Sequence, residues 1–223
     1  MNRINRINTI IFDLDGTLLD TLDDLSNSVN YALRQHLMPQ RSQKEIRSFL
    51  GNGIANLMRR SVPDGTTDDK FNETFLTFRE HYVDHCLDLT KPYVGIMSLL
   101  DELKQKGIKM AIVSNKLHPA VQELNERFFK GYINSAVGES ATVRRKPNPD
   151  AVIAALRELK STKEEALYVG DSEVDLATAR NVGMACVCVS WGFRDRDLLR
   201  TLNPDFLIDE PKELFQIIEN PMA

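Results

Sequence analysis

Two aspartates lie two residues apart where an apolar run ends near the start of the sequence. They are Asp13 and Asp15 in the stretch IIFDLDGTLLDT, residues 10–21. Two carboxylates held in one small space repel each other, so the ionised pair is costly unless a cation joins it. The pair therefore predicts a bound metal ion, a charged substrate, or both.

Other polar residues follow later apolar runs in the same way. Ser114 and Asn115 come after KMAIV, Asp171 comes after ALYVG, and Lys146 lies in a loop before a predicted helix. Ligands of open α/β sheets bind beyond the carboxyl ends of the parallel strands. We therefore expect these side chains to gather at one edge of a sheet.

The residues expected at this edge include the ligand types that Mg2+ prefers. The ion takes oxygen ligands in octahedral geometry and usually keeps several water molecules. Asp13, Asp171 and a backbone carbonyl near Asp15 could supply three ligands. The Asp15 carboxylate would then be available for proton transfer, and Lys146 would add positive charge for a phosphoryl group.

Alternating strands and helices must position these residues. Strands are predicted at TIIF, KMAIV, YINSAV, ALYVG and ACVCVS, with a weaker one at DFLI. Helices are predicted from Ile96 to before Gly107 and at residues 119–129, 149–159 and 174–182. This alternation predicts an α/β fold with a Rossmann-like parallel sheet covered by helices on both faces.

One long segment interrupts the alternation, because residues 21–89 show only helical periodicity. We therefore predict an α/β core domain formed by residues 1–17 and 90–223, and an inserted all-helical cap domain formed by residues 18–89.

Two features inside the insertion have structural interpretations. An aromatic stripe at helical spacing is typical of a bundle core. The stripe consists of Phe71, Phe75, Phe78 and Tyr82. At the start of the insertion, Thr21 and Asp24 fit a helix-capping pattern.

Composition narrows the class of protein. The 223 residues are 42% hydrophobic and 27% charged, with a formal net charge of -4. This balance offers no electrostatic reason to bind nucleic acid or an anionic membrane, and no apolar stretch is long enough to span a bilayer. We expect a cytoplasmic monomer or homodimer that binds a small molecule. The three cysteines are odd in number, and no disulfide is predicted.

Four ordered motifs carry a resemblance to a known family. FDLDGTLLDT, VSNK, RRKPNPD and VGDSEVDLATARNVG resemble the motifs of the haloacid dehalogenase-like phosphohydrolases, whose cap lies where this chain has its helical insertion. The dehalogenases of that family lack an acid at the position of Asp15, so the intact pair favours phosphoester chemistry. Ser114 stands where threonine is more usual and keeps the hydroxyl group.

The resemblance implies a role for each reacting residue. Asp13 would be the nucleophile that becomes an aspartyl phosphate. Asp15 would protonate the leaving oxygen and then activate the hydrolytic water. Ser114 would donate a hydrogen bond to the phosphoryl group, and Lys146 would balance its charge.

The resemblance also implies supporting roles. Asp171 would hold Mg2+ together with Asp13, Asp175 would support the site from one helical turn further on, and Thr17 would orient the loop.

Substrate choice is expected to come from the insertion. Gly51, Asn52 and Gly53 form a loop at a helix start, where exposed N–H groups attract anions. The alternative is a tight turn between helices. This stretch resembles the phosphoglycolate phosphatase branch, in which the loop amides or Lys116 would hold the substrate carboxylate. Asn115, beside Lys116 in the VSNK motif, is a further binding candidate.

The favoured function is a Mg2+-dependent phosphatase that acts on a small phosphorylated metabolite, with 2-phosphoglycolate as the expected substrate. An inorganic pyrophosphatase is the nearest alternative, and a sugar-phosphate mutase is the third. A binding protein without catalytic activity on the same fold is the last. The five core residues Asp13, Asp15, Ser114, Lys146 and Asp171 argue against it.

Overall fold

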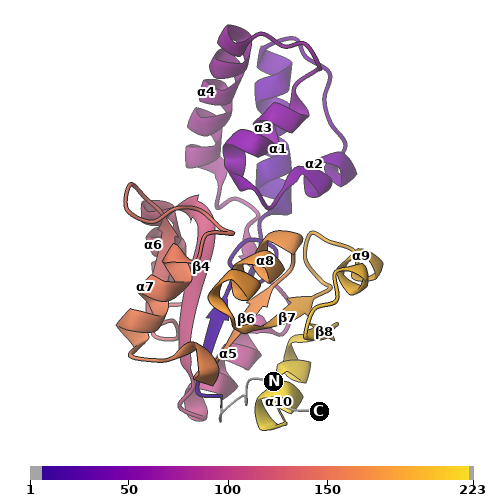
Figure 1. Cartoon of the computed structure of the whole chain (residues 1–223). Helices are drawn as coiled ribbons and strands as arrows, with labels where there is room; N and C mark the ends of the chain where they lie inside the picture. The colour runs from indigo at the N-terminus through magenta and orange to yellow at the C-terminus, as the bar shows by residue number, and fades with distance from the viewer. Residues whose placement is uncertain (1–6, 221–223) are drawn as a thin grey trace. The chain divides into compact units, whose positions relative to one another are not determined.

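The computed structural model describes residues 7–220 (Figure 1). The chain divides into two compact units. One consists of the residues up to Leu18 together with those from Pro92 onward, and the other is Leu19–Lys91. The chain therefore leaves the first unit once and returns to it once.

A six-stranded parallel sheet forms the centre of the first unit. Its strand order is β5-β4-β1-β6-β7-β8, and every neighbouring pair is parallel. The strands are β1 (Thr9–Phe12), β4 (Lys109–Leu117), β5 (Ser135–Glu139), β6 (Ala166–Gly170), β7 (Ala185–Val189) and β8 (Phe206–Ile208). β1 lies between β4 and β6, so its carboxyl end opens at the middle of the sheet edge.

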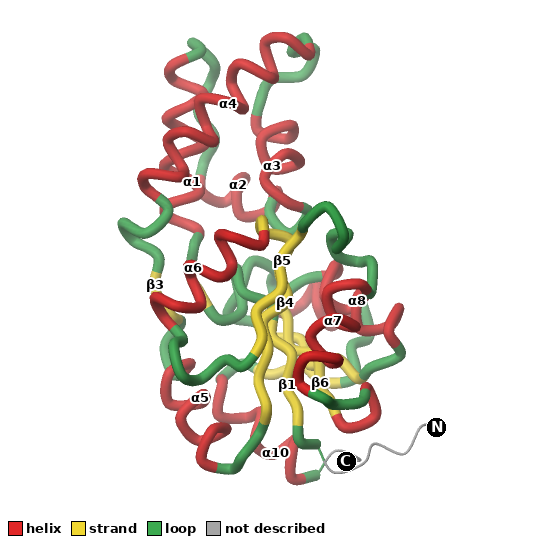
Figure 2. The backbone as a smooth tube through the Cα atoms, turned by 90° about the vertical axis from the view of Figure 1, so that its left-hand side faces the viewer, coloured by secondary structure: helices red, strands yellow, loops and turns green. Residues whose placement is uncertain are grey.

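Helices cover both faces of this sheet. Figure 2 shows α5 and α6 on one side of the strands and α7 and α8 on the other. The helices of this unit are α5 (Ile96–Gln105), α6 (His118–Phe128), α7 (Asp150–Leu159), α8 (Glu173–Val182), α9 (Arg196–Thr201) and α10 (Leu214–Glu219), with 3-10 turns at Lys163–Glu165 and Pro211–Glu213. The predicted α/β fold is confirmed.

The strands are apolar along their length because both of their faces are buried. Ile11 of β1 is fully buried in one cluster with Val113 of β4, Tyr168 of β6 and Val152 of α7. The cysteines at 186 and 188 are buried thiols of β7 in the same cluster, and no disulfide is formed within residues 7–220.

The strand predicted at KMAIV is longer than expected. β4 continues through Ser114, Asn115 and Lys116 to Leu117, where the chain still pairs with Glu139 of β5. The ladder is irregular between Val113 and Leu117. The sequence pattern missed this extension because SNK has no apolar alternation, whereas pairing with β5 keeps the backbone extended.

The second unit is helical, as the periodicity predicted. It contains α1 (Leu22–Gln35), α2 (Gln43–Phe49), α3 (Gly53–Ser61) and α4 (Asp68–His85), and short strands β2 (Leu19–Asp20) and β3 (Lys91–Pro92) pair where the chain enters and leaves it. The α4 rings of the predicted stripe stack in sequence, and Phe71, Phe78 and Tyr82 are buried. None of the helices within residues 7–220 combines the length and the apolarity of a bilayer span.

A helix does start at Thr21 as its capping pattern indicated, but the capping bond itself is absent, and Asp24 has a different role. Thr21 occupies the N-cap position of α1, but its backbone is not extended and its hydroxyl has no hydrogen-bond partner among residues 7–220. The buried Asp24 carboxylate instead accepts backbone N–H bonds from Leu89 at 3.0 and 3.1 Å and from Thr90 at 2.8 Å. Asp24 therefore ties the first helix of this unit to its last residues.

Replacing Asp24 by alanine should destabilise the protein. Asp24→Ala leaves the N–H groups of Leu89 and Thr90 without their acceptor, so the free energy of unfolding should fall by about 2–3 kcal/mol. Asp23→Ala is the matched control, because it also removes a carboxylate from the first turn of α1, but an exposed one bonded to Gln43. Chemical denaturation checks both variants, and equal losses would contradict the proposed tie.

Candidate active site

One buried lysine holds two carboxylates at the carboxyl edge of the sheet. Lys146 Nζ lies 2.7 Å from Asp13 Oδ1 and 2.7 Å from Asp175 Oδ1, and its side chain is 3% exposed. Asp13 directly follows β1, and its N–H donates to the carbonyl of Val169 in β6 at 2.8 Å. The bond to lysine occupies Oδ1 and leaves Oδ2 of Asp13 as the atom that could attack phosphorus.

The loop that carries Lys146 is fixed through Asn115. The Asn115 side chain accepts a hydrogen bond from the Lys146 N–H at 2.6 Å and donates one to the Lys146 carbonyl at 3.3 Å. This reciprocal pair joins the end of β4 to the loop before α7. Asn115 was predicted to bind substrate, but its amide acts on the backbone of Lys146, so its contact points to a positioning role.

Asp175 is fully engaged by hydrogen bonds. Its Oδ1 accepts from Lys146 and, at 3.1 Å, from the Tyr168 hydroxyl, while its Oδ2 accepts from the N–H and the hydroxyl of Ser172 at 3.1 and 2.6 Å. The last two bonds also cap the start of α8. With four donors on its two oxygens, Asp175 suits a supporting role better than that of a metal ligand.

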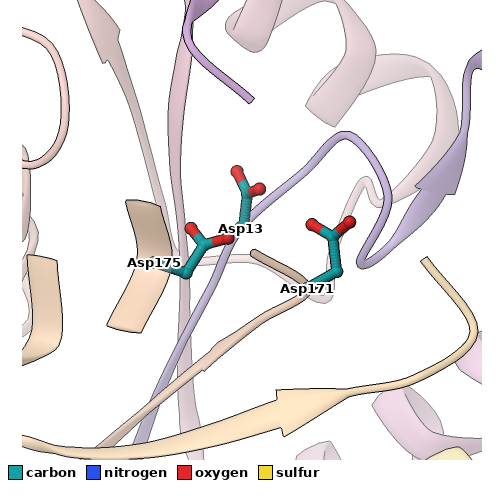
Figure 3. Close-up of side chains that lie close together, drawn as sticks. All are labelled: Asp13, Asp171 and Asp175. Atoms are coloured by element: carbon teal, nitrogen blue, oxygen red, sulfur yellow. The ribbon is translucent and has the colours of Figure 1, made fainter. Parts of the chain in front are cut away.

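Asp171 follows β6 and has one oxygen fixed. Its Oδ2 accepts the Phe193 N–H at 2.6 Å, whereas Oδ1 has a long contact of 3.4 Å from the Thr17 hydroxyl. Figure 3 shows Asp13, Asp171 and Asp175 converging from the ends of β1 and β6 and from α8. One carboxylate oxygen of each lies within 4.8 Å of the others.

The charges of this cluster are unbalanced. Burial and the neighbouring Asp175 raise the pKa of Asp13 well above its usual value despite Lys146, and the same two causes raise the pKa of Asp171 to about 7. Burial alone would lower the pKa of Lys146, but Asp13 and Asp175 raise it. Three carboxylates and one ammonium sum to a charge of -2 when ionised. A divalent cation would balance that charge, and Asp13 and Asp171 offer the oxygen ligands to hold it.

A second lysine, Lys116, forms an ion pair with Asp15, the other aspartate of the opening pair. Lys116 Nζ lies 3.1 Å from Asp15 Oδ1, and their side chains are 10% and 20% exposed. The Ser114 hydroxyl oxygen accepts the N–H of Lys116 at 3.1 Å and is buried. Asp15 and Lys116 therefore form the less buried part of the site, next to the buried Ser114.

The remaining candidates, Gly51, Asn52 and Gly53, belong to the helical unit. Gly51 and Gly53 have positive φ angles of 108° and 79°, and Asn52 is the N-cap residue of α3 without a side-chain capping bond. The loop thus has the glycine-dependent backbone of a tight turn. Its part in substrate binding stays a prediction.

Sequence reasoning missed several residues that surround these groups. Trp191 Nε1 donates to the Thr17 carbonyl at 3.0 Å, and Arg194, which is buried, bonds Glu173 at 2.7 and 2.8 Å. Two signals were available in the sequence. Ser172 and Asp175 have capping-box spacing, and the only tryptophan of the chain directly follows the predicted strand ACVCVS, where ligands collect in such sheets.

Comparison with known proteins identifies the family of this fold and site. The model of the haloacid dehalogenase-like hydrolases matches residues 10–189. The chain is 31% identical to a phosphoglycolate phosphatase of Aquifex aeolicus over 95% of this chain and 96% of that protein. It is 30% identical to the pyrophosphatase PpaX of Bacillus cereus (strain G9842) over 96% of this chain and 98% of that protein.

A solved structure agrees with these matches. The crystal structure of a protein from Lactobacillus delbrueckii subsp. bulgaricus is 33% identical, with a TM-score of 0.91 over 96% of this chain and 99% of that chain. The chain belongs to the haloacid dehalogenase-like hydrolases, as the four motifs predicted. It is a phosphatase of that family, with phosphoglycolate phosphatases among its relatives.

The raised pKa values predict how the stability of the metal-free protein depends on pH. A carboxyl group with a higher pKa in the folded state binds more protons there, so its stabilising effect is lost as pH rises through the folded value. Asp171, with a pKa of about 7, should make the protein less stable at pH 7.5 than at pH 5 in chelator. Added Mg2+ should raise the melting temperature more at pH 7.5, since it favours the ionised carboxylates.

The variant Asp171→Asn supplies the control for this measurement. His81 works in the opposite direction, because burial lowers its pKa and the folded protein then gains stability as pH rises. Asp171→Asn keeps His81 and Asp13 and removes one of the two carboxyl groups whose pKa is raised. Thermal unfolding of both proteins in chelator at the two pH values isolates Asp171, and identical pH profiles would contradict the expected linkage.

Proposed function

We propose that this phosphatase hydrolyses 2-phosphoglycolate through an aspartyl phosphate on Asp13, with Mg2+ as its cofactor. The observation that carries the proposal is the presence of two partly or fully buried ammonium groups, one at each aspartate of the opening pair. Lys146 lies beside Asp13, and Lys116 lies beside Asp15. Such a site suits a substrate with a second anionic group next to the leaving oxygen.

In the first half of the reaction, Asp13 Oδ2 attacks phosphorus and the bond from phosphorus to the glycolate oxygen breaks. Asp15 donates its proton to that oxygen, so the leaving group departs as a neutral hydroxyl. Ser114 donates a hydrogen bond to the transferring phosphoryl group, and Lys146 offsets its negative charge. Mg2+, held by Asp13, Asp171 and the Asp15 carbonyl, would supply further electrostatic stabilisation.

In the second half, water attacks phosphorus of the aspartyl phosphate. Asp15, now ionised, takes a proton from the water, and the bond between phosphorus and Asp13 breaks to release phosphate and the free carboxylate. The Lys146 bond to Oδ1 keeps the Asp13 carboxylate oriented throughout. Asp175 acts only through Lys146, which it holds in place together with Asn115.

Lys116 would select the substrate. In 2-phosphoglycolate a single methylene group separates the leaving oxygen from the carboxylate, so an oxygen within reach of Asp15 brings the carboxylate toward Lys116. Pyrophosphate meets the same condition, because its second phosphate carries the leaving oxygen. The PpaX relatives favour pyrophosphate as the second candidate substrate. A cytoplasmic location and a monomeric or dimeric state stay predictions from the sequence.

A substrate panel decides between these candidates. We expect kcat/KM with Mg2+ to be highest for 2-phosphoglycolate among pyrophosphate, sugar phosphates and an aryl phosphate, with free phosphate as product and little activity in chelator. A higher kcat/KM for pyrophosphate would move the assignment to the second candidate. An isomeric sugar phosphate without free phosphate would indicate a mutase.

Replacing Asp13 and replacing Asp15 should reduce activity in different ways. Asp13→Asn should abolish turnover and covalent phosphorylation, because the amide is a poor nucleophile. Asp15→Asn should lose about 10²- to 10⁴-fold in kcat, the contribution typical of a positioned acid and base. Mass spectrometry of quenched reactions should find the phosphoryl group on Asp13. Near-normal activity of Asp13→Asn, with deamidation excluded, would show that the nucleophile is misassigned.

Replacing Lys116 should reduce activity selectively. Lys116→Met keeps most of the length of the side chain and removes the charge. The value of kcat/KM for 2-phosphoglycolate should therefore fall at least about tenfold more than that for an aryl phosphate, as expected when transition-state binding of one anionic group is lost. Lys130→Met is the control, because Lys130 is exposed and pairs with Glu126. Equal losses on both substrates would refute selection by Lys116 and leave it a role in holding Asp15.

A further inference from the structure

A short segment after β7 contacts both the loop after β1 and Asp171, which carry the candidate cation ligands. The Trp191 indole N–H donates to the Thr17 carbonyl at 3.0 Å, and the Phe193 N–H donates to Asp171 Oδ2 at 2.6 Å. Thr17 lies in the loop, residues 13–18, that begins at Asp13 and ends before β2. This segment, Trp191–Arg194, therefore joins the nucleophile loop to the end of β6 through two separate hydrogen bonds.

The contact between the segment and the loop has no spare room. A Cβ atom added at Gly192 would lie 2.2 Å from the Gly16 carbonyl oxygen and 2.4 Å from Asp171 Cβ. A Cβ atom added at Gly16 would lie 2.5 Å from Asp171 Oδ2 and 2.8 Å from Phe193 Cδ2. Because neither glycine has a side chain, the Trp191–Arg194 segment packs directly on the loop after β1 and on Asp171. A shift of the segment toward that loop would therefore displace Asp171.

The far end of the segment is anchored as well. Arg194 is buried and makes two hydrogen bonds to Glu173, at 2.7 and 2.8 Å. Glu173 is the first residue of α8, between Asp171 and Asp175. The segment is therefore attached to the nucleophile loop at Trp191 and to the start of α8 at Arg194.

We propose that Trp191 is a positioning residue for the divalent cation: its indole hydrogen bond holds the Asp13–Thr17 loop against the Asp171 side of the site. The proposal rests on the cation site of the proposed function. Phe193 fixes Asp171 Oδ2, so Oδ1, at 3.4 Å from the Thr17 hydroxyl, is the oxygen that could bind the cation. Trp191 fixes the loop that carries Asp13 and the Asp15 carbonyl. Ligands held by such surrounding bonds are preorganised, so they lose less conformational entropy when the ion binds.

The position of this tryptophan also makes it a reporter. The chain has one tryptophan, so all tryptophan emission of the protein comes from Trp191. Its indole N–H is bonded to the carbonyl of the loop that would close on the cation. Binding of Mg2+ should therefore change the emission of Trp191 with the same midpoint as the binding isotherm.

The experiment is a titration of the full chain with Mg2+ alone, followed by calorimetry and by tryptophan emission. Trp191→Phe keeps an aromatic ring and removes the N–H donor. Its Kd for Mg2+, measured by calorimetry, should rise about tenfold. This is the lower end of the effect that is usual when a residue that orients metal ligands is removed. Activity lost at low Mg2+ should recover in part at saturating Mg2+, which a general loss of folding would not produce.

Tyr132→Phe is the matched control for the lost hydrogen bond. The Tyr132 hydroxyl donates to Asp101 at 2.9 Å, outside the candidate site, so the Kd of this variant for Mg2+ should stay within about twofold of the wild-type value. Gly192→Ala should weaken Mg2+ binding at least as much as Trp191→Phe, because its methyl group has no space. Trp191→Phe carries the test whether or not Gly192→Ala folds.

The outcomes separate this proposal from the proposed function. Wild-type protein that binds no Mg2+ would overturn the cation site and with it the role of Trp191. Tight binding by the wild type that is unchanged in Trp191→Phe would overturn the positioning role alone. An emission change that persists in Asp171→Asn would overturn the reporter, because Trp191 would then respond to Mg2+ bound at another site.

Discussion

The ammonium of Lys146, buried between Asp13 and Asp175, is the interaction on which the rest of the site depends. Two buried carboxylates at 2.7 Å from one cation are stable only while all three groups stay together, since removing one leaves an uncompensated charge. The surrounding contacts act on this cluster. Asn115 holds the backbone of Lys146, and Ser172 holds Asp175.

The parallel sheet explains why these groups meet. β1 lies between β4 and β6, so the residues after these three strands lie at one edge of the sheet. Asp13 follows β1, Asp171 follows β6, and Ser114 lies near the end of β4. The strand order thus brings these three side chains together, while Lys146 reaches them from the loop before α7 and Asp175 from α8.

The charge balance connects structure to cofactor. Burial penalises the ionised forms of Asp13 and Asp171, and Lys146 compensates for only one carboxylate. A divalent cation would lower that penalty and at the same time hold a phosphoryl oxygen. One ion would then supply both order and reactivity to the site. Lys116, paired with Asp15, extends positive charge to the less buried side where a substrate anion would lie.

The sequence alone determined the alternation of strands and helices, the helical insertion and the residues at the strand ends, because periodicity and chain order are local properties. It also determined the family through four motifs. The tertiary structure decided which polar groups meet. Asn115 acts on the Lys146 backbone, β4 runs on to Leu117, and Asp24 binds the N–H groups of Thr90 and Leu89. Trp191 reaches Thr17 across 174 residues of chain. Such contacts depend on how buried donors find acceptors far away in the sequence, which no local pattern records.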